Sequence, residues 1–215
     1  EEGGLWAGRT LYDLYSEAYT PWEWQPRLKT LADDIGILLF SSPFDVTAVD
    51  FLEKMDVPAY KIASFEITDI ELLRRVARTG KPIIMSTGVA DLADIELAIR
   101  TCKEAGNDQI VLLKCTSAYP APYNEMNLRM IPNMKETFGC CVGLSDHSLD
   151  DEVAIAAVAL GADVIEKHFT LRRSDGGVDS AFSMEAEEMK NMVVRIRHVE
   201  EAMGRVSYEL TEKQI

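Results

Sequence analysis

The chain has 215 residues, 47% of them apolar, and it carries 36 acidic against 22 basic side chains, for a net charge of -14. This length and apolar content are sufficient for one domain with a substantial core. The acidic balance repels nucleic acid phosphates and anionic membrane surfaces, so neither a polynucleotide nor a membrane is an expected partner. An anionic small substrate would require a local basic pocket.

The cysteines favour a reducing compartment. Cys102, Cys115, Cys140 and Cys141 form no Cys-x-x-Cys pair, and two adjacent cysteines make a poor disulfide or zinc site. Residues 1–8 show no basic segment followed by an apolar core, and no apolar run approaches about 18 residues. We therefore expect a soluble, cytoplasmic protein without a signal peptide or a membrane span.

The predicted elements alternate between short apolar runs and amphipathic helices. A helix over 10–20 and a second over 21–31 come first, and from there each apolar run, predicted as a strand, precedes a helix. The predicted strands are 37–41, 59–63, 83–86, 110–115, 142–147 and 164–169, and the helices that follow them are 46–55, 70–79, 92–105, 130–138, 149–161 and 185–203.

This alternation is typical of βαβ crossovers on a parallel sheet. Hydroxyl, carboxylate and imidazole groups collect just after the strands, and the glycine-rich dinucleotide and P-loop motifs are absent. We therefore predict an α/β fold, a TIM-type (β/α)8 barrel with its site at the carboxyl ends of the strands. Such a barrel closes with eight strands, but only six βα units are recognisable. Either two units are absent or the sheet is open, and an open sheet would expose the apolar run over 37–40 as an edge.

Two predicted strands end in a histidine close to a carboxylate: His147 follows Asp146, and His168 follows Glu166 and Lys167. Polar residues within buried parallel strands cost free energy, so they usually mark function. If the two strands are neighbours about 4.8 Å apart, the imidazoles could share one metal ion, and Asp146 and Glu166 could orient the rings. The alternative is that each histidine is a hydrogen-bonded residue of the core or the rim.

A metal held by only two imidazoles keeps coordination positions free for substrate oxygens and water, as a Lewis-acid catalyst requires. Two nitrogen ligands plus oxygens suit Mn²⁺ or another first-row divalent ion better than an all-oxygen Mg²⁺ site. We therefore expect a divalent metal cofactor, with Mn²⁺ favoured and Mg²⁺ or Co²⁺ as alternatives.

Two lysines interrupt the apolar strands. Lys61 points to the same side of its strand as Ala59 and Ala63, and Lys114 holds a similar position on a later strand. Their ammonium groups, with the hydroxyls that follow the strands, would bind a phosphate or a carboxylate. The alternative is that Lys61 forms a structural ion pair with Glu66 or another carboxylate.

Several stretches resemble the sialic acid synthase family, whose members condense phosphoenolpyruvate with an amino sugar to form nonulosonic acids. The resemblance covers about residues 41–210. The stretches SSPF, Ser117-Ala118-Tyr119 and DSAFS are similar to the pseudaminic acid synthase branch, and N-acetylneuraminate or legionaminate synthesis is the alternative. The matching segments are, in order, SSPFD, AYKIASFE, GKPIIMSTG, LLKCTSAYPAP, VGLSDHS, VALGADVIEKHFT and GGVDSAFS.

The resemblance implies roles for individual residues. It makes His147 and His168 the metal ligands and, together with Lys61, the catalytic residues. Lys61 and serines at the strand ends would hold the phosphate and carboxylate of phosphoenolpyruvate, while Tyr119 and Asp179 would contact the sugar. The complete predicted substrate-binding set is Ser42, Ser64, Glu66, Ser86, Lys114, Ser117, Tyr119 and Asp179, in which Ser117 replaces a family asparagine.

The resemblance also implies a reaction and a domain organisation. The sugar's aldehyde is polarised by the metal, C3 of phosphoenolpyruvate attacks it, water adds to the oxocarbenium carbon, and phosphate leaves by C–O cleavage. Family members add two N-terminal strands and a C-terminal antifreeze-like domain, which lends an arginine to the partner subunit of a homodimer. We recognise neither part, so we predict that residues 1–215 form a partial catalytic barrel with little or no activity alone. The alternatives are a non-catalytic phosphate- or sugar-binding module and a metal-dependent hydrolase or aldolase.

Overall fold

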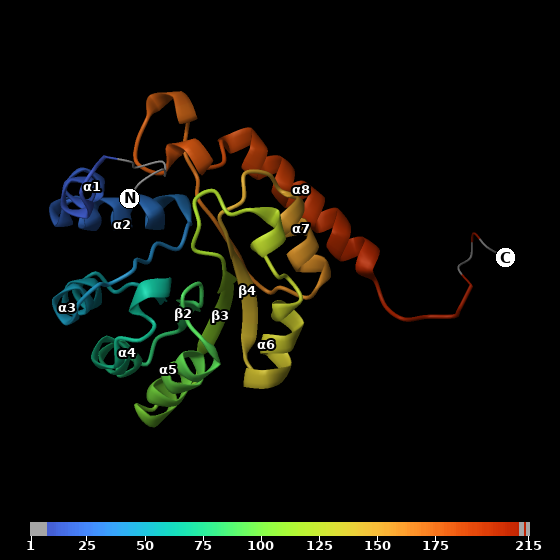
Figure 1. The fold of residues 1–215 in the computed structure, drawn as a ribbon, viewed down its shortest axis with the longest axis horizontal. Helices are drawn as coiled ribbons and strands as arrows, with labels where there is room; N and C mark the ends of the chain where they lie inside the picture. Colours follow the sequence, from blue (N-terminus) through green and yellow to red (C-terminus); the bar gives the residue numbers. More distant parts are fainter. Residues whose placement is uncertain (1–7, 211–212, 214–215) are drawn as a thin grey trace.

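A parallel five-stranded sheet lies at the centre of the fold, which a computed structural model describes for residues 8–210 and 213 (Figure 1). Each strand pairs with the next strand along the chain, so the sheet order follows the sequence order. The expectation about a signal peptide rests on residues of which 1–7 lie outside this description. The strands are β1 (Tyr60–Ile62), β2 (Ile83–Ser86), β3 (Ile110–Cys115), β4 (Cys141–Asp146) and β5 (Ile165–Lys167).

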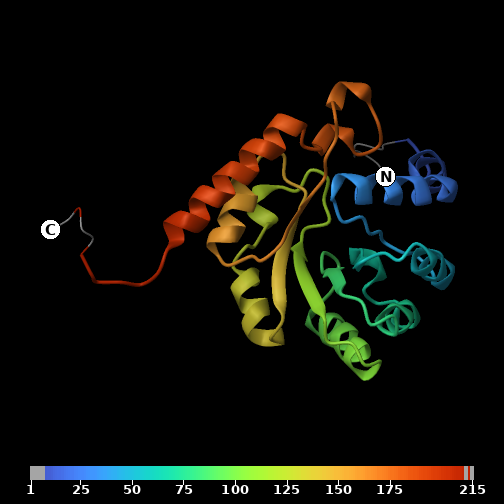
Figure 2. The same cartoon turned by 180° about the vertical axis from the view of Figure 1, so that it is seen from behind.

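Helices connect the strands and cover one face of the curved sheet (Figures 1 and 2). Aspartates begin three of these helices, because their side chains accept the backbone N–H groups that a first helical turn leaves unpaired: Asp45, Asp69 and Asp91. The order of strands and helices along the chain confirms the predicted alternation. The helices are α1 (Leu11–Ala18), α2 (Gln25–Ile35), α3 (Val46–Lys54), α4 (Ile70–Ala77), α5 (Leu92–Glu104), α6 (Met130–Phe138), α7 (Glu152–Ala159) and α8 (Ala186–Met203).

The predicted strand over 37–41 does not form. Only Ser41 pairs with the sheet, through an isolated parallel bridge to Tyr60, and Ile37 and Leu38 are 60% and 75% exposed. Among the described residues this run has a β-neighbour on one side only, so its apolar side chains find little cover. The six predicted strands become five, and the sheet is an open half-barrel with an apolar edge, as the open alternative predicted.

Side-chain alternation gives the sheet two different faces. The outer face packs beneath the helices and is apolar: Tyr60, Ile62, Met85, Leu112 and Leu144 belong to the main core cluster and are fully buried. The inner face carries the residues of opposite parity. Its row at the carboxyl end is polar, with Cys115 opposite Ser145 and Ser145 opposite Glu166 in the strand register.

The remaining elements lie at the two sides of the sheet. Helices α1 and α2 lie on the β1 side, and α7 and α8 lie on the β5 side (Figure 1). Trp22 stacks on Phe51 of α3 with ring centroids 4.6 Å apart, which packs the segment before α2 against the helical layer. Among the described residues, no helix combines the length and the apolar character needed to cross a membrane.

Candidate active site

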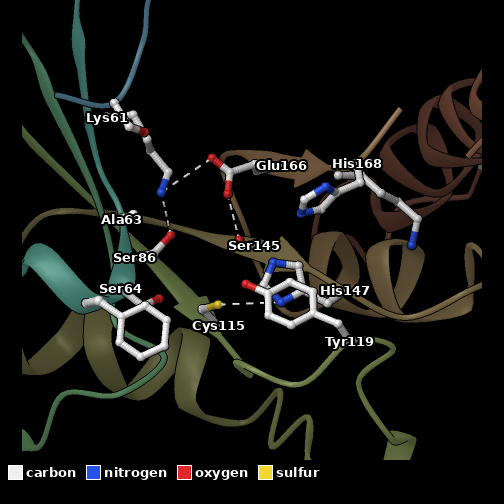
Figure 3. A pocket seen from close by; sticks show the side chains of 13 residues that line it. Lys61, Ala63, Ser64, Ser86, Cys115, Tyr119, Ser145, His147, Glu166 and His168 are labelled. Atoms are coloured by element: carbon white, nitrogen blue, oxygen red, sulfur yellow. Dashed lines mark hydrogen bonds and ion pairs between the residues drawn. The ribbon is translucent and has the colours of Figure 1, made fainter. Parts of the chain in front are cut away.

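A polar pocket of about 350 Å³ lies at the carboxyl ends of the strands (Figure 3). The inner-face residue at or near the end of every strand contributes to its wall: Lys61, Ser86, Cys115, Ser145 and Glu166. In parallel α/β barrels this end of the sheet is where active sites form. Of the eleven predicted site residues, seven line the pocket, namely Ser42, Lys61, Ser64, Ser86, Tyr119, His147 and His168.

Lys61 directs its ammonium group into this pocket (Figure 3). Its Nζ donates to Ser86 Oγ at 2.8 Å and to the carbonyl of Ile62 at 3.1 Å, and it lies 3.6 Å from Glu166 Oε2. Glu166 also accepts a hydrogen bond of 2.6 Å from Ser145 Oγ. The ion-pair partner of Lys61 is therefore Glu166 on the far edge of the sheet, whereas the sequence suggested the nearby Glu66 first.

The two pocket histidines contact each other in an edge-on arrangement. The ring centroids of His147 and His168 lie 5.3 Å apart with an interplanar angle of 62°, and Tyr119 packs against His147 at 4.3 Å. Phe182 from the loop before α8 covers His168 at 4.9 Å. The two imidazoles thus converge on one small volume at the end of β4 and β5.

A backbone carbonyl orients His147. Its Nδ1 lies 2.9 Å from the carbonyl oxygen of Thr116, which can only accept, so Nδ1 carries a proton and Nε2 bears the lone pair in the neutral ring. His168 Nδ1 lies 3.6 Å from Asp179 Oδ2. The sequence suggested that Asp146 and Glu166 orient the rings, and a direct contact of this kind is wrong. Asp146 bonds Lys167 and the backbone of Ser148, and Glu166 bonds Ser145 and pairs with Lys61.

The local environment shifts the proton affinities of these groups. Burial works against a charged ring, yet contact with Cys115 and the Thr116 carbonyl raises the pKa of His147 above its usual value. Burial lowers the pKa of His168, with partial opposition from Asp179. Burial alone would raise the pKa of the Cys115 thiol, but its contact with His147 brings that pKa to about 7. His147 is therefore more basic than His168.

Four predicted site residues lie outside the pocket wall. Lys114 sits on the outer row of β3, opposite Leu144, and its Nζ bonds the carbonyl of Cys115 at 2.6 Å and Thr116 Oγ1 at 3.1 Å. The sequence placed Lys114 like Lys61, but the two lysines occupy opposite faces of the sheet. Burial lowers the pKa of Lys114.

Of the other three, Ser117 and Asp179 contact residues of the pocket wall. Ser117 Oγ is 3.9 Å from the thiol of Cys115, and Asp179 contacts His168 as described above. Glu66 follows β1, and burial raises its pKa. Its Oε2 is buried without a hydrogen-bond partner among the described residues.

The two histidines fit a divalent metal. Two imidazoles that bind one ion through nitrogens about 2.1 Å away have ring centroids about 4.5–6 Å apart, and the observed 5.3 Å lies in this range. In its neutral form, with Nδ1 bonded to the Thr116 carbonyl, His147 would bind a metal through Nε2. No group of three or more His, Cys, Asp or Glu residues arranged for a metal occurs within the described chain. An ion held here would have two protein ligands from that part of the chain, and its other positions would be open.

The sequence missed several residues of the wall. Ser145 and Cys115 lie on the inner row, and residue parity along β3 and β4 could have identified both once Lys61 was taken as inward. Phe182 carries no such signal, because its contact with His168 depends on how the loop before α8 folds back.

Together these features define a class of protein. It is an open parallel α/β barrel of the TIM type, with a pocket of imidazole, ammonium and hydroxyl groups at the carboxyl ends of its strands. The profile of the NeuB family matches residues 1–208, and the chain belongs to that family. The resemblance inferred from the sequence motifs and the predicted barrel-type fold are both confirmed.

Individual relatives agree with this assignment. A pseudaminic acid synthase from Campylobacter jejuni is 46% identical over 214 residues, which cover 100% of this chain and 62% of that protein. An N,N'-diacetyllegionaminic acid synthase from the same species is 44% identical over 175 residues, 80% of this chain and 52% of that protein. An N-acetylneuraminic acid synthetase from Leptospira borgpetersenii, solved with citrate, superimposes with a TM-score of 0.88 at 33% identity, covering 94% of this chain and 70% of that one. The chain thus spans about 62% of the length of its pseudaminic acid synthase relative.

Proposed function

We propose that this chain forms the barrel part of a phosphoenolpyruvate-dependent nonulosonic acid synthase. The enzyme would condense phosphoenolpyruvate with a (di)acetamido amino sugar to give a nonulosonic acid, pseudaminic acid in the first instance, and inorganic phosphate. The similarity to a pseudaminic acid synthase over the whole chain supports this choice. Legionaminate or N-acetylneuraminate synthesis is the second candidate, supported by the similarity to a diacetyllegionaminic acid synthase.

The single observation that carries the proposal is the arrangement of charges in the pocket. The Lys61 ammonium and the hydroxyls of Ser64 and Ser86 lie in the same pocket as the two imidazoles. Phosphoenolpyruvate carries a phosphate and a carboxylate, which need such donors in a chain with a net charge of -14. The Lys61 ammonium lies 3.6 Å from Glu166 Oε2, which is a long distance for an ion pair. A substrate anion can therefore replace Glu166 as the partner of Lys61.

His147 and His168 would hold a divalent ion, with Mn²⁺ as our proposed metal. A bound ion of this kind supplies Lewis acidity toward the aldehyde oxygen of the open-chain sugar. The protein's own contribution is to place that aldehyde. Tyr119 packs on His147, and burial raises the pKa of Tyr119 to about 12, which keeps its hydroxyl protonated as a donor for the sugar. Asp179 beside His168 would accept a hydrogen bond from a sugar hydroxyl.

The phosphoenolpyruvate half of the reaction is assigned to the β1 and β2 ends of the sheet. Lys61, Ser64 and Ser86 would bind the phosphate, neutralise charge as the C–O bond breaks, and keep C3 directed at the aldehyde carbon. Burial raises the pKa of Glu66 above its ordinary value. Its Oε2 has no hydrogen-bond partner among the described residues, and we keep Glu66 in the proposed substrate-binding set. Ser42 completes this side of the wall.

Two features of the proposal concern the protein in the cell. The four cysteines are free thiols, which suits a reducing compartment, and on this ground we propose a cytoplasmic location. We also propose a homodimer as the working form, because the family resemblance implies one.

The test uses phosphoenolpyruvate labelled with ¹⁸O at the bridging oxygen, the amino sugar and Mn²⁺, added to the protein that contains this chain. We expect the label in inorganic phosphate and solvent oxygen at C2 of the product. A binding module would bind phosphoenolpyruvate without releasing phosphate. A hydrolase or aldolase would place no solvent oxygen at C2 of a condensed product, and either result would overturn the proposal. For residues 1–215 alone we predict phosphoenolpyruvate binding with little or no turnover, which full turnover would contradict.

A further inference from the structure

Lys167 is a buried cation whose bonding capacity is fully used. Its side chain is 1% exposed and lies on β5 directly before His168. The ammonium lies 2.8 Å from Asp146 Oδ2 and from the carbonyls of Ser148 and Asp150. An ammonium group has three N–H donors, and these three acceptors occupy all of them. Although Lys167 contributes to the pocket wall, its charge is therefore committed to the protein itself.

The partners of Lys167 surround the other histidine. Asp146, 0% exposed, precedes His147 on β4 and stands opposite Lys167 in the strand register. Its second oxygen accepts the backbone N–H of Ser148 at 2.8 Å. The backbone on both sides of His147 is thus bonded, directly or through Asp146, to the residue that precedes His168.

Stability alone does not account for this arrangement. Removing two charges from water is expensive, and apolar pairs of similar size often replace buried ion pairs without loss of stability. An apolar pair, however, could not bond the carbonyls of Ser148 and Asp150. What the charged pair adds is a fixed path for the backbone that carries His147.

We propose that Asp146 and Lys167 are a positioning pair that holds His147 and His168 at the separation required to bind one divalent cation. Neither side chain bonds the imidazoles, so the pair acts through the backbone. The inference rests on the proposed function, because it assumes that the two histidines bind a metal.

The experiment measures Mn²⁺ affinity from the electron paramagnetic resonance signal of the free ion, which does not depend on turnover. Lys167→Met alone would leave a buried unpaired carboxylate, so the main variant is Asp146→Asn combined with Lys167→Met. We expect this double variant to fold, by circular dichroism, and to bind Mn²⁺ at least about tenfold more weakly than the unsubstituted chain. Asp146→Asn alone keeps Lys167 and its two carbonyl contacts, and we expect a loss of about threefold or more.

Lys135→Met is the matched control. It removes a 2.7 Å ion pair with Asp163, whose carboxylate also bonds the backbone of Val142, at the opposite end of β4 and β5. We expect it to change Mn²⁺ affinity by less than about twofold.

The outcomes separate the two proposals. If the unsubstituted chain binds no Mn²⁺, or if His147→Ala binds it equally well, the metal site is wrong and the positioning inference falls with it. If His147→Ala loses binding while the folded double variant keeps full affinity, the metal site stands and the positioning inference is overturned. Should the double variant not fold, unchanged affinity in Asp146→Asn overturns the inference in the same way.

Discussion

The inner and outer faces of the sheet are built from the same strands but carry different chemistry. On the outer face Ile62, Leu112 and Leu144 are fully buried beneath helices. One residue away in sequence, Lys61 and Ser145 face the pocket. Alternate residues of each strand therefore have different roles. Those on the outer face stabilise the fold, and those on the inner face line the site of the proposed reaction.

The two interior lysines show how sharply the faces divide. Lys61 and Lys114 each follow an apolar residue near a strand end, yet only Lys61 lines the pocket. Lys114 binds the carbonyl of Cys115 and the hydroxyl of Thr116 on the other side of the sheet. The position of a lysine along its strand decides which face of the sheet its side chain lies on, and therefore whether its charge can contact a substrate.

The largest expected effect comes from the outer face. Leu112→Ala should lower the free energy of unfolding by about 2–5 kcal/mol, because it leaves a cavity in the fully buried core. Urea titration measures the change, with Leu97→Ala on the exposed side of α5 as a control expected to cost less than about 1 kcal/mol. Phosphoenolpyruvate affinity of the folded variant should stay within about twofold. A loss of affinity in the fully folded protein would mean that the two faces are not independent.

A substitution on the inner face should weaken substrate binding and leave the stability of the fold almost unchanged. Lys61→Met should weaken phosphoenolpyruvate binding about 100-fold, or about 2.7 kcal/mol, because it removes the ammonium that faces the pocket. Calorimetry measures the affinity, and urea titration should show little change in stability. Lys114→Met is the matched control, with affinity expected within about twofold. Equal losses in the two variants would contradict the division between faces.

A smaller effect is expected where three loops meet at the pocket. A Cβ on Gly88 would lie 2.2 Å from Ser117 Oγ, 2.8 Å from Ser64 Oγ and 3.0 Å from Cys115 Sγ. Gly88→Ala must therefore displace the two hydroxyls, and we expect phosphoenolpyruvate to bind about tenfold more weakly, about 1.4 kcal/mol. Adding Ser117→Ala removes the shortest contact and should recover part of the loss relative to Ser117→Ala alone. No change in affinity with Gly88→Ala would show that these hydroxyls do not touch the substrate.

The smallest expected effect on stability concerns the ion pair between Arg173 and Glu188. Arg173 bonds both oxygens of Glu188 at 2.6 Å and lowers the pKa of Glu188 from its ordinary 4.5 to about 2. Because the pKa of Glu188 is lower in the folded state than in the unfolded state, its charge stabilises the fold at pH values above about 4.5. This contribution disappears as the pH falls from about 4.5 toward 2. Because both side chains are partly exposed, Glu188→Gln should cost about 1 kcal/mol or less at neutral pH. Unfolding curves of the two proteins should converge near pH 2, and a constant difference would contradict the assignment.

Much of the fold was predictable from local patterns. Short apolar runs and amphipathic spacing identified β1 through β5 and the helices between them, because periodicity and helix-start residues act over a few neighbours. The run over 37–41 has the same pattern and failed, since a strand also needs partners that the sequence cannot display. Seven predicted site residues line one pocket because all parallel strands end at the same edge.

The sequence by itself determined the order of elements, the acidic surface, the family resemblance and the placement of His147 and His168 after consecutive strands, all of which are encoded in near neighbours. The tertiary structure alone decided that Lys61 meets Glu166, that Thr116 orients His147 and that Lys167 bonds Asp146, Ser148 and Asp150. Each of these contacts joins segments separated by many residues. Strand register and loop path place them together, and neither is written in any short stretch of sequence.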